Sequence, residues 1–359
     1  MIAGLGNKSI RHLAELYPDP TEVFNCSHSR LCELFGKHTG IIKAIEQKTT
    51  VAAAEKSAKE LERYGIKALF FTESDYPQRL NQPGCEDAPV LLYMLGNCNL
   101  NATHSVAVVG TRKATDYGRT TTARLVREMS SKDILIVSGL AYGIDTEAHR
   151  TAVDTGLPTV GVLGHGLDQL YPPQNRQLAE RMLAQGGALL TEYPFGTAIS
   201  GANFPARNRI IAALADATVV VEAAERGGAL ITANMASGYN REVFAVPGRV
   251  GDPYSAGCNN LIVNNRAILI RNAGDLLFQM GWEDHRDCPD PKVKQQELFT
   301  TLSGNEQSVV GALRDGRELT MDEIVAKCGL PLPKIASLLL DLELKNVIRC
   351  LPGKLYKLV

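Results

Sequence analysis

The chain has 359 residues, of which 45% are hydrophobic and 21% charged, a composition that excludes a disordered or low-complexity protein and suits about two or three packed domains. The formal net charge is −1, so any anion-binding site must be local rather than a basic coat over the whole surface. No apolar run approaches the roughly 18 residues of a membrane span, and the first residues lack the apolar core of a signal peptide; we therefore expect a cytoplasmic protein. The cysteines are scattered without a CxxC pair, which predicts reduced thiols, no metal site and no cofactor of that kind.

Residues 1–73 show helical periodicity and many lysines, and they predict a small N-terminal helical domain. Within it, GLGNKSIRHL is similar to the hairpin and second helix of a helix-hairpin-helix. Two interpretations remain open for this region: a helical cap that is structural or binds a partner, and an independent DNA-binding module.

Residues 74–282 alternate short apolar runs with helical stretches. Continuous apolar strands separated by helices are typical of a parallel sheet that is covered on both faces. The pattern therefore predicts an α/β fold with a doubly wound, extended Rossmann-like and mostly parallel sheet. The expected strands are 106–109, 134–138, 159–164, 188–193, 217–223, 242–248 and 267–271.

The first of these strands runs into Gly110, Thr111, Arg112 and Lys113, and a helix is expected to begin near Tyr117. A glycine turn that opens a helix can hold a phosphate on backbone N–H groups, and an arginine suits the same ligand. The alternative is a plain tight turn with a surface arginine. The loop matches neither a Walker A motif nor GxGxxG, which argues against P-loop hydrolysis and a standard nicotinamide site.

The second strand ends in Ser138 and Gly139, again at the carboxyl edge where ligands of such sheets bind. Asp145 follows as a possible N-terminal cap of the next helix. His149 lies four residues further on, and without an evident nucleophile or metal partner we interpret it as structural.

The stretch 203–211 contains Phe204, Arg207, Asn208 and Arg209. Cationic side chains beside an aromatic ring are what single-stranded nucleic acid requires, because the cations contact phosphates and the ring stacks on a base. The alternative is that the ring is a core residue and the arginines form surface pairs.

A third glycine turn, Gly227 and Gly228, follows the strand that ends near Glu222. Residues 101–282 also contain 14 arginines and only 2 lysines, whereas the rest of the chain has 8 and 14. Arginine suits bidentate phosphate contacts and stacking on bases. The three turns and this bias together favour an anion site at one edge of the sheet.

Residues 283–295 are polar and contain proline, and we interpret them as a linker. Residues 296–359 predict three helices followed by a hairpin around Pro352 and Gly353, the order of a winged-helix domain. The third helix carries no net charge, which favours protein contacts or weak duplex contacts over sequence-specific reading in the major groove.

Taken together, VAVVGTRKATDYG, IVSGLAYGIDTEAHR, NFPARNRII and ERGGALITANMA resemble the DprA/Smf (DNA-processing protein A) family over residues 74 to about 280. The resemblance implies an extended Rossmann fold that binds single-stranded DNA, with a sterile-alpha-motif-like domain before it. It also implies the roles of the loops: Gly110 and Arg112 hold phosphates, Ser138 and Gly139 line the same pocket, and the glycines at 227 and 228 let the strand approach the backbone. The expected DNA-binding residues are Gly110, Thr111, Arg112, Lys113, Ser138, Gly139, Phe204, Arg207, Asn208, Arg209, Gly227 and Gly228.

The resemblance further implies a homodimer through the Rossmann domain and loading of RecA onto incoming single strands during natural transformation, without catalytic turnover. Two departures from the family pattern are Gly227, where many relatives carry serine, and Asn265-Arg266-Ala267 before the last strand. The main alternative function is a Rossmann-type enzyme that cleaves nucleoside monophosphates, because Glu222 with ERGGALIT partly matches the glycine turn and glutamate of such proteins. A third is an adaptor that acts through its end domains.

Overall fold

The computed structural model describes residues 2, 4–48, 50–282, 303–313, 319–345, 347–351 and 355–358. The chain divides into two compact units, Met1–Trp282 and Glu283–Val359. Among the helices of the described residues, none combines the length and the apolarity that a membrane span requires.

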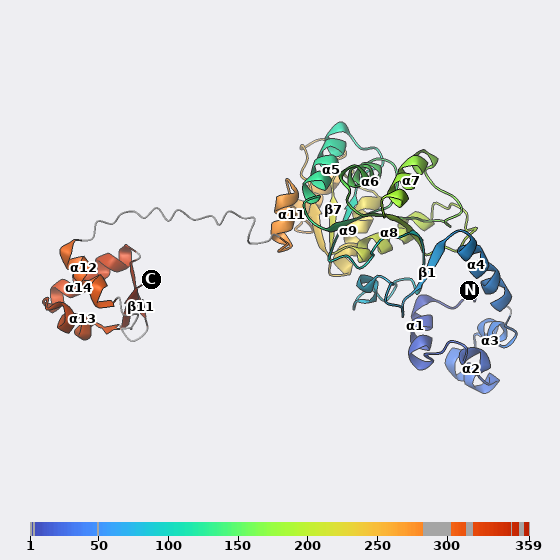
Figure 1. The fold of residues 1–359 in the computed structure, drawn as a ribbon, viewed down its shortest axis with the longest axis horizontal. Coiled ribbons are helices and arrows are strands. Elements are labelled where there is room, and N and C mark those ends of the chain that lie inside the picture. The colour runs from blue at the N-terminus through green and yellow to red at the C-terminus, as the bar shows by residue number, and fades with distance from the viewer. Residues whose placement is uncertain are drawn as a thin grey trace. The chain divides into compact units, whose positions relative to one another are not determined.

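A nine-stranded sheet organises the first unit (Figure 1). The order of its strands is β1-β2-β6-β5-β4-β3-β7-β8-β9. Strands β3 to β9 run parallel to one another, while β2 is antiparallel to both β1 and β6. The strands are β1 (Ile66–Phe70), β2 (Leu91–Gly96), β3 (His104–Val109), β4 (Ile134–Ser138), β5 (Thr159–Val162), β6 (Ala188–Thr191), β7 (Ala217–Val220), β8 (Glu242–Ala245) and β9 (Ile268–Leu269).

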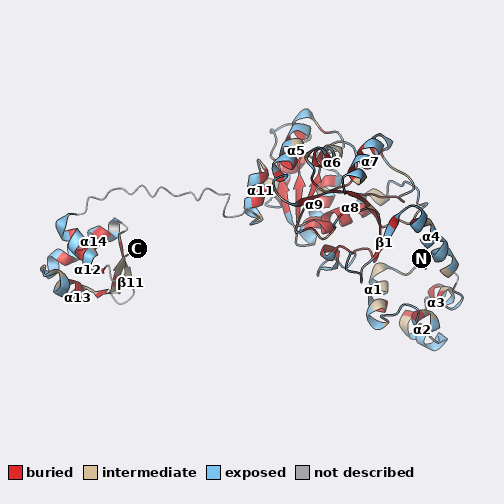
Figure 2. Cartoon of the chain, in the orientation of Figure 1, coloured by how far each residue is buried: buried red, intermediate tan, exposed pale blue. Residues whose placement is uncertain are grey.

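Helices cover both faces of this sheet, which confirms the predicted doubly wound α/β architecture. Successive residues of a strand point to opposite faces, and β3 shows the result: Val106 and Val108 pack in one core cluster, Ala107 and Val109 in the other. The first face packs under α5 (Asp116–Met129), α6 (Ile144–Thr155) and α11 (Ala273–Gln279). The second face packs under α8 (Asn203–Leu214), α9 (Gly228–Gly238) and α10 (Ala256–Val263). Figure 2 shows the buried strands between helices whose outer faces are exposed.

All seven predicted strands are present, but β1 and β2 were not predicted as strands. Helices α1 (Asn7–Leu16), α2 (His28–Phe35), α3 (Thr39–Glu46) and α4 (Val51–Arg63) lead directly into β1. The sheet therefore begins at Ile66, inside the region expected to form a separate domain to residue 73. Arg11 on α1 also donates to Asn81 Oδ1 (2.9 Å), and the N-terminal helices belong to the same compact unit as the sheet.

The strand order reverses at β3, which lies between β4 and β7. In open α/β sheets the crevice at such a switch point, beyond the carboxyl ends of the strands, is the preferred place for a ligand. The loop after β3 and the loop after β7 meet there. Helix α7 (Arg176–Ala184) completes the first unit between β5 and β6.

The second unit is a winged-helix domain, as predicted. Helices α12 (Gly304–Leu313), α13 (Met321–Cys328) and α14 (Leu332–Leu344) pack on a small antiparallel sheet of β10 (Leu319–Thr320), β12 (Leu355–Leu358) and β11 (Ile348–Leu351). A reciprocal capping box between Thr320 and Glu323 begins α13. The expected linker at 283–295 and the turn at Pro352 and Gly353 lie outside the described residues.

Candidate nucleic-acid interface

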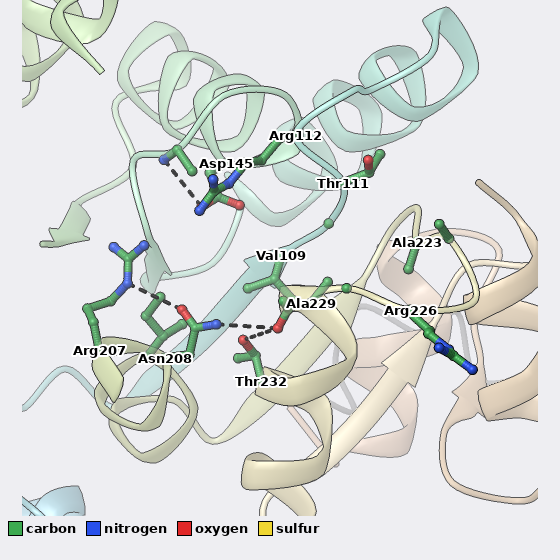
Figure 3. A pocket seen from close by; sticks show the side chains of 16 residues that line it. Val109, Thr111, Arg112, Asp145, Arg207, Asn208, Ala223, Arg226, Ala229 and Thr232 are labelled. Atoms are coloured by element: carbon green, nitrogen blue, oxygen red, sulfur yellow. Dashed lines mark hydrogen bonds between the residues drawn. The ribbon is translucent and has the colours of Figure 1, made fainter. Parts of the chain in front are cut away.

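A cavity of about 250 Å³ opens at the switch point, between the loops that follow β3 and β7. Figure 3 shows Arg207 and Asn208 on one side of it and Arg226 on the other. Three arginines and a single carboxylate line it, so its charge is positive although the chain as a whole is near neutral. The lining residues are Val109, Gly110, Thr111, Arg112, Ala141, Asp145, Arg207, Asn208, Ile211, Ala223, Ala224, Arg226, Gly227, Gly228, Ala229 and Thr232.

The loop after β3 is held in place from two sides. The Thr111 amide donates to the carbonyl oxygen of Glu222 (2.7 Å), and the Ile144 amide donates to the carbonyl of Thr111 (3.3 Å). Gly143, with φ +79°, packs directly on this loop. A Cβ at Gly110 would lie 2.8 Å from Ile144 Cβ and 2.9 Å from the Glu222 carbonyl oxygen, so internal packing requires this glycine.

Arg112 is the most available cation of that loop. Its side chain is exposed, and its guanidinium carbon lies 5.3 Å from the centre of the Phe204 ring. Within the described part of the chain, the guanidinium makes no hydrogen bond or ion pair. Lys113 is also exposed, and its amide donates to Thr111 Oγ1 (3.1 Å). Both cations are therefore free to bind an anion.

The loop after β4 supports the pocket from beneath. Ser138 is fully buried, and its hydroxyl donates to the Val108 carbonyl (2.7 Å), so it does not reach the cavity. Asp145 accepts from the amides of Gly139 (3.1 Å) and Ala141 (3.4 Å). It therefore fixes the loop before α6 rather than capping the helix as predicted, because it lies inside the first turn. Gly139 has no room for a side chain beside Arg207 and Asp145.

Arg207 is a buried structural cation. It is only 3% exposed, and its Nη1 donates to the carbonyls of Gly139 (2.7 Å) and Val162. Burial lowers the pKa of Arg207 to about 10 and raises the pKa of Asp145, and each charge opposes the shift of the other. Arg207 thus contributes a fixed positive charge to the cavity wall, and its Nη1 is committed to backbone carbonyls rather than to the open cavity.

Of the other two predicted residues at the start of α8, Asn208 lies at the cavity and Arg209 does not. Asn208 Nδ2 donates to the carbonyl of Gly228 (3.3 Å), which ties α8 to the start of α9 beside the cavity. Arg209 instead forms an ion pair with Glu192 and does not line the cavity. The structure therefore brings Asn208 to the candidate site and leaves Arg209 away from it.

Phe204 is partly buried and has a role between the two alternatives considered for it. Its ring packs closely over Gly164, where an added Cβ would lie 3.2 Å from the ring atom Cδ1. The ring also lines a second hollow of about 650 Å³ together with Arg112, Arg226 and Ile231. One part of the ring is thus anchored and another part faces open space.

Gly227 and Gly228 border both hollows. A Cβ at Gly227 would meet nothing within 4 Å, and one at Gly228 would meet only Asn208 Nδ2 at 3.6 Å. These glycines are therefore not required by packing, and their missing side chains leave open the approach to the N-terminus of α9. Arg226, which the sequence analysis quoted in ERGG without choosing it, is exposed and unpaired within the described residues.

Two buried groups considered for a chemical role, Glu222 and His149, are structural. Glu222 accepts from the amide (2.9 Å) and the hydroxyl (2.6 Å) of Thr115. His149 is fully buried, with Nδ1 2.7 Å from Thr159 Oγ1, and burial lowers the pKa of its ring to about 3. This agrees with the structural interpretation of the histidine.

The comparisons with known proteins now identify the family. The family model of DNA recombination-mediator protein A matches residues 67–281. The chain belongs to the DNA recombination-mediator protein A (DprA) family. A DprA winged-helix model matches residues 295–354, in agreement with the fold of the second unit.

Among DprA relatives, Protein Smf of Synechocystis is 32% identical over 99% of this chain and 96% of its own length. The X-ray structure of DprA from Streptococcus pneumoniae superimposes with a TM-score of 0.68 at 32% identity, covering 77% of this chain and 94% of that one. The structure of the Helicobacter pylori protein, solved in a study of its single-stranded DNA binding mode, gives a TM-score of 0.55 at 29% identity, covering 62% and 98%.

Proposed function

We propose that this protein binds single-stranded DNA in the cavity at the switch point, with backbone phosphates against Arg112 and the N-terminus of α9. The observation that carries the proposal is the cavity itself: it is positive and bordered by glycines, and within the described residues neither Arg112 nor Arg226 makes a hydrogen bond or an ion pair. The study of the H. pylori relative, which concerns single-stranded DNA, supports the choice of ligand.

Phe204 supports a single strand over a duplex. A ring that is anchored on one side and open on the other can stack on a base only when that base is unpaired and turned out. Arg112 lies over the same ring, so a phosphate contact and a base contact are available side by side. A duplex would keep its bases inside and could use only the cations.

The decisive experiment is a titration of the full chain with oligo-dT at several salt concentrations. Binding through phosphates predicts that log K falls against log salt with a slope of about −0.7 for each phosphate neutralised. Arg112→Ala should weaken binding and make the slope shallower, while Arg181→Ala, an exposed arginine paired with Asp154, should change neither. Parental affinity in a folded Arg112→Ala protein would overturn the proposal.

The alternative of a nucleotide-cleaving enzyme finds little support in the geometry. The glutamate that matches such enzymes in sequence, Glu222, is 3% exposed, and both its carboxylate oxygens accept hydrogen bonds from Thr115. A carboxylate in this position closes the loop after β3 and is not presented to a substrate. Release of base from a panel of nucleoside monophosphates would reverse this conclusion.

Our proposal extends to a homodimer, and the last strand supports it. β9 forms one edge of the sheet, and Ile268 and Leu269 on it are exposed, as is the neighbouring Val263 at 77%. Exposed apolar side chains along a strand edge are typical of surfaces that bind a partner. Light scattering should give twice the chain mass, and Leu269→Lys should reduce it to that of a monomer.

We also propose that the protein acts in the cytoplasm during DNA uptake and hands its strand to RecA, which is the role implied by the family resemblance. The test is RecA-dependent strand exchange on DNA that is first covered by a single-strand-binding protein. The parental protein should accelerate the reaction, and Arg112→Ala should not.

A further inference from the structure

Three aromatic rings form a row that begins at the candidate site and extends away from it. Phe204 lies beside Tyr171, with ring centres 5.8 Å apart, and Tyr171 lies beside Tyr142, with centres 6.5 Å apart. The three residues come from different parts of the chain: the start of α8, the segment after β5 and the loop after β4. We call Tyr142, Tyr171 and Phe204 the aromatic row.

The two tyrosines are unusually exposed for rings in contact with other rings. Tyr142 is 38% exposed and Tyr171 is 37% exposed. A core role would bury such rings, because aromatic side chains gain most of their stabilising effect from area removed from water. The row therefore leaves a substantial aromatic surface open to solvent next to Arg112.

The Tyr142 ring is nevertheless held through its hydroxyl, and the main chain that carries Tyr171 is held through its amide. The hydroxyl of Tyr142 donates to Gln174 Oε1 (2.5 Å), and Gly143, the next residue, packs directly on the loop that carries Arg112. The amide of Tyr171 donates to Nε2 of the buried His165 (3.3 Å). A ring that is already ordered loses little conformational entropy when a ligand stacks on it.

We propose that the aromatic row is a base-stacking track, in which Tyr142 and Tyr171 take unpaired bases of nucleotides that neighbour the one at Phe204. This inference rests on the proposed function, since it needs the phosphates to be held by Arg112. Aromatic rings stack on any base with little preference for sequence. The track thus extends the contact with the strand beyond the cavity, to two residues, Tyr142 and Tyr171, that were not predicted to bind DNA.

The test compares two ligands of equal length, oligo-dT and an oligonucleotide with abasic sites along the same backbone. Tyr142→Ala and Tyr171→Ala should each weaken oligo-dT binding by about 5- to 10-fold, the lower part of the range for base–aromatic stacking, and should leave binding of the abasic strand unchanged. Tyr171→Phe keeps the ring and should bind like the parent, while Tyr142→Phe keeps the ring without its bond to Gln174 and should lose less affinity than Tyr142→Ala. Phe278→Ala removes an exposed ring (69%) from α11, outside the row, and should have no effect.

A second measurement needs no variant. An oligonucleotide that carries 5-iodouracil, irradiated in complex with the parental full chain, should form crosslinks that peptide mapping places at Tyr142 or Tyr171. Crosslinks confined to other residues, or alanine variants that lose equal affinity for both ligands, would overturn the track. If Tyr142→Ala and Tyr171→Ala bind oligo-dT like the parent while Arg112→Ala does not, the stacking track is refuted and the proposed function stands. If Arg112→Ala also binds like the parent, the proposed function is refuted as well.

Discussion

Two glycines of the candidate site predict opposite outcomes when each receives a side chain. At Gly228 a Cβ would meet only Asn208 Nδ2, at the ordinary contact distance of 3.6 Å, and the space beyond it belongs to both hollows. At Gly110 a Cβ would lie 2.8 Å from Ile144 Cβ and 2.9 Å from the backbone oxygen of Glu222. The first site has room and the second has none.

Gly228→Leu should therefore fold normally and lose DNA. Neither glycine has a left-handed backbone, so the substitution causes no strain of that kind, and replacing glycine in a helix changes stability by at most about 1 kcal/mol. The leucine would fill the space proposed for phosphates, and we expect affinity for oligo-dT to fall at least about tenfold, equivalent to about 1.4 kcal/mol.

Gly110→Ala should show the reverse. Overpacking of this kind costs about 1–3 kcal/mol, and it would also disturb the bond between the Thr111 amide and Glu222. Urea unfolding followed by circular dichroism measures the stability of both variants, and fluorescence anisotropy with oligo-dT measures binding. A Gly228→Leu protein that binds like the parent would show that the strand does not lie in the cavity. A Gly110→Ala protein as stable as the parent would refute the packing argument.

Two further predictions concern stability. Arg79 is almost fully buried and donates to both carboxylate oxygens of Asp216 (2.7 Å each) and to the Ala102 carbonyl (2.8 Å). Arg79→Ala should lower the free energy of unfolding by about 3 kcal/mol, the lower limit for a broken buried pair, because the Asp216 side chain is 23% exposed and still accepts from the Ser105 amide. A urea midpoint equal to that of the parent would contradict this. The pKa of His149 in the folded state, about 3, lies below the ordinary value of 6.5, so the unfolded chain binds the extra proton first and the free energy of unfolding falls as the pH drops below 6.5. Between pH 7.5 and 5 the free energy of unfolding of the parent should fall by about 2 kcal/mol more than that of His149→Gln. Equal losses in the two proteins would count against a neutral buried ring.

The central sheet was predictable because its strands are buried on both faces and are therefore continuously apolar in sequence. β1 was missed because it lies at the margin of the sheet, where Lys67, Ala68 and Phe70 are exposed and the apolar signal is broken. The boundary between the N-terminal helices and the sheet was consequently placed too late in the chain. β2 (LLYMLG) is continuously apolar and buried at its centre, so its sequence did carry the signal of a strand.

The three glycine turns were also predictable, since strand–glycine–helix is a local pattern. The reason for a glycine at each turn was not predictable, because it depends on the neighbouring atoms, which come from distant parts of the sequence. A side chain at Gly110 would collide with Ile144 and the Glu222 carbonyl, whereas a side chain at Gly228 would enter open space. The same residue type in the same kind of turn serves packing in one case and access in the other.

Helix geometry shows that Arg207 and Arg209 of α8 should not both have been predicted for the same site. Residues two positions apart on an α-helix lie about 200° apart around its axis, so Arg207 and Arg209 cannot both face one ligand. The structure places Arg207 under the cavity and Arg209 against Glu192. Arg207 is also 3% exposed, and its Nη1 is committed to the carbonyls of Gly139 and Val162. The exposed arginines at this edge, Arg112 and Arg226, lie on loops instead, because a loop at the sheet edge can expose a guanidinium that a packed helix must bury.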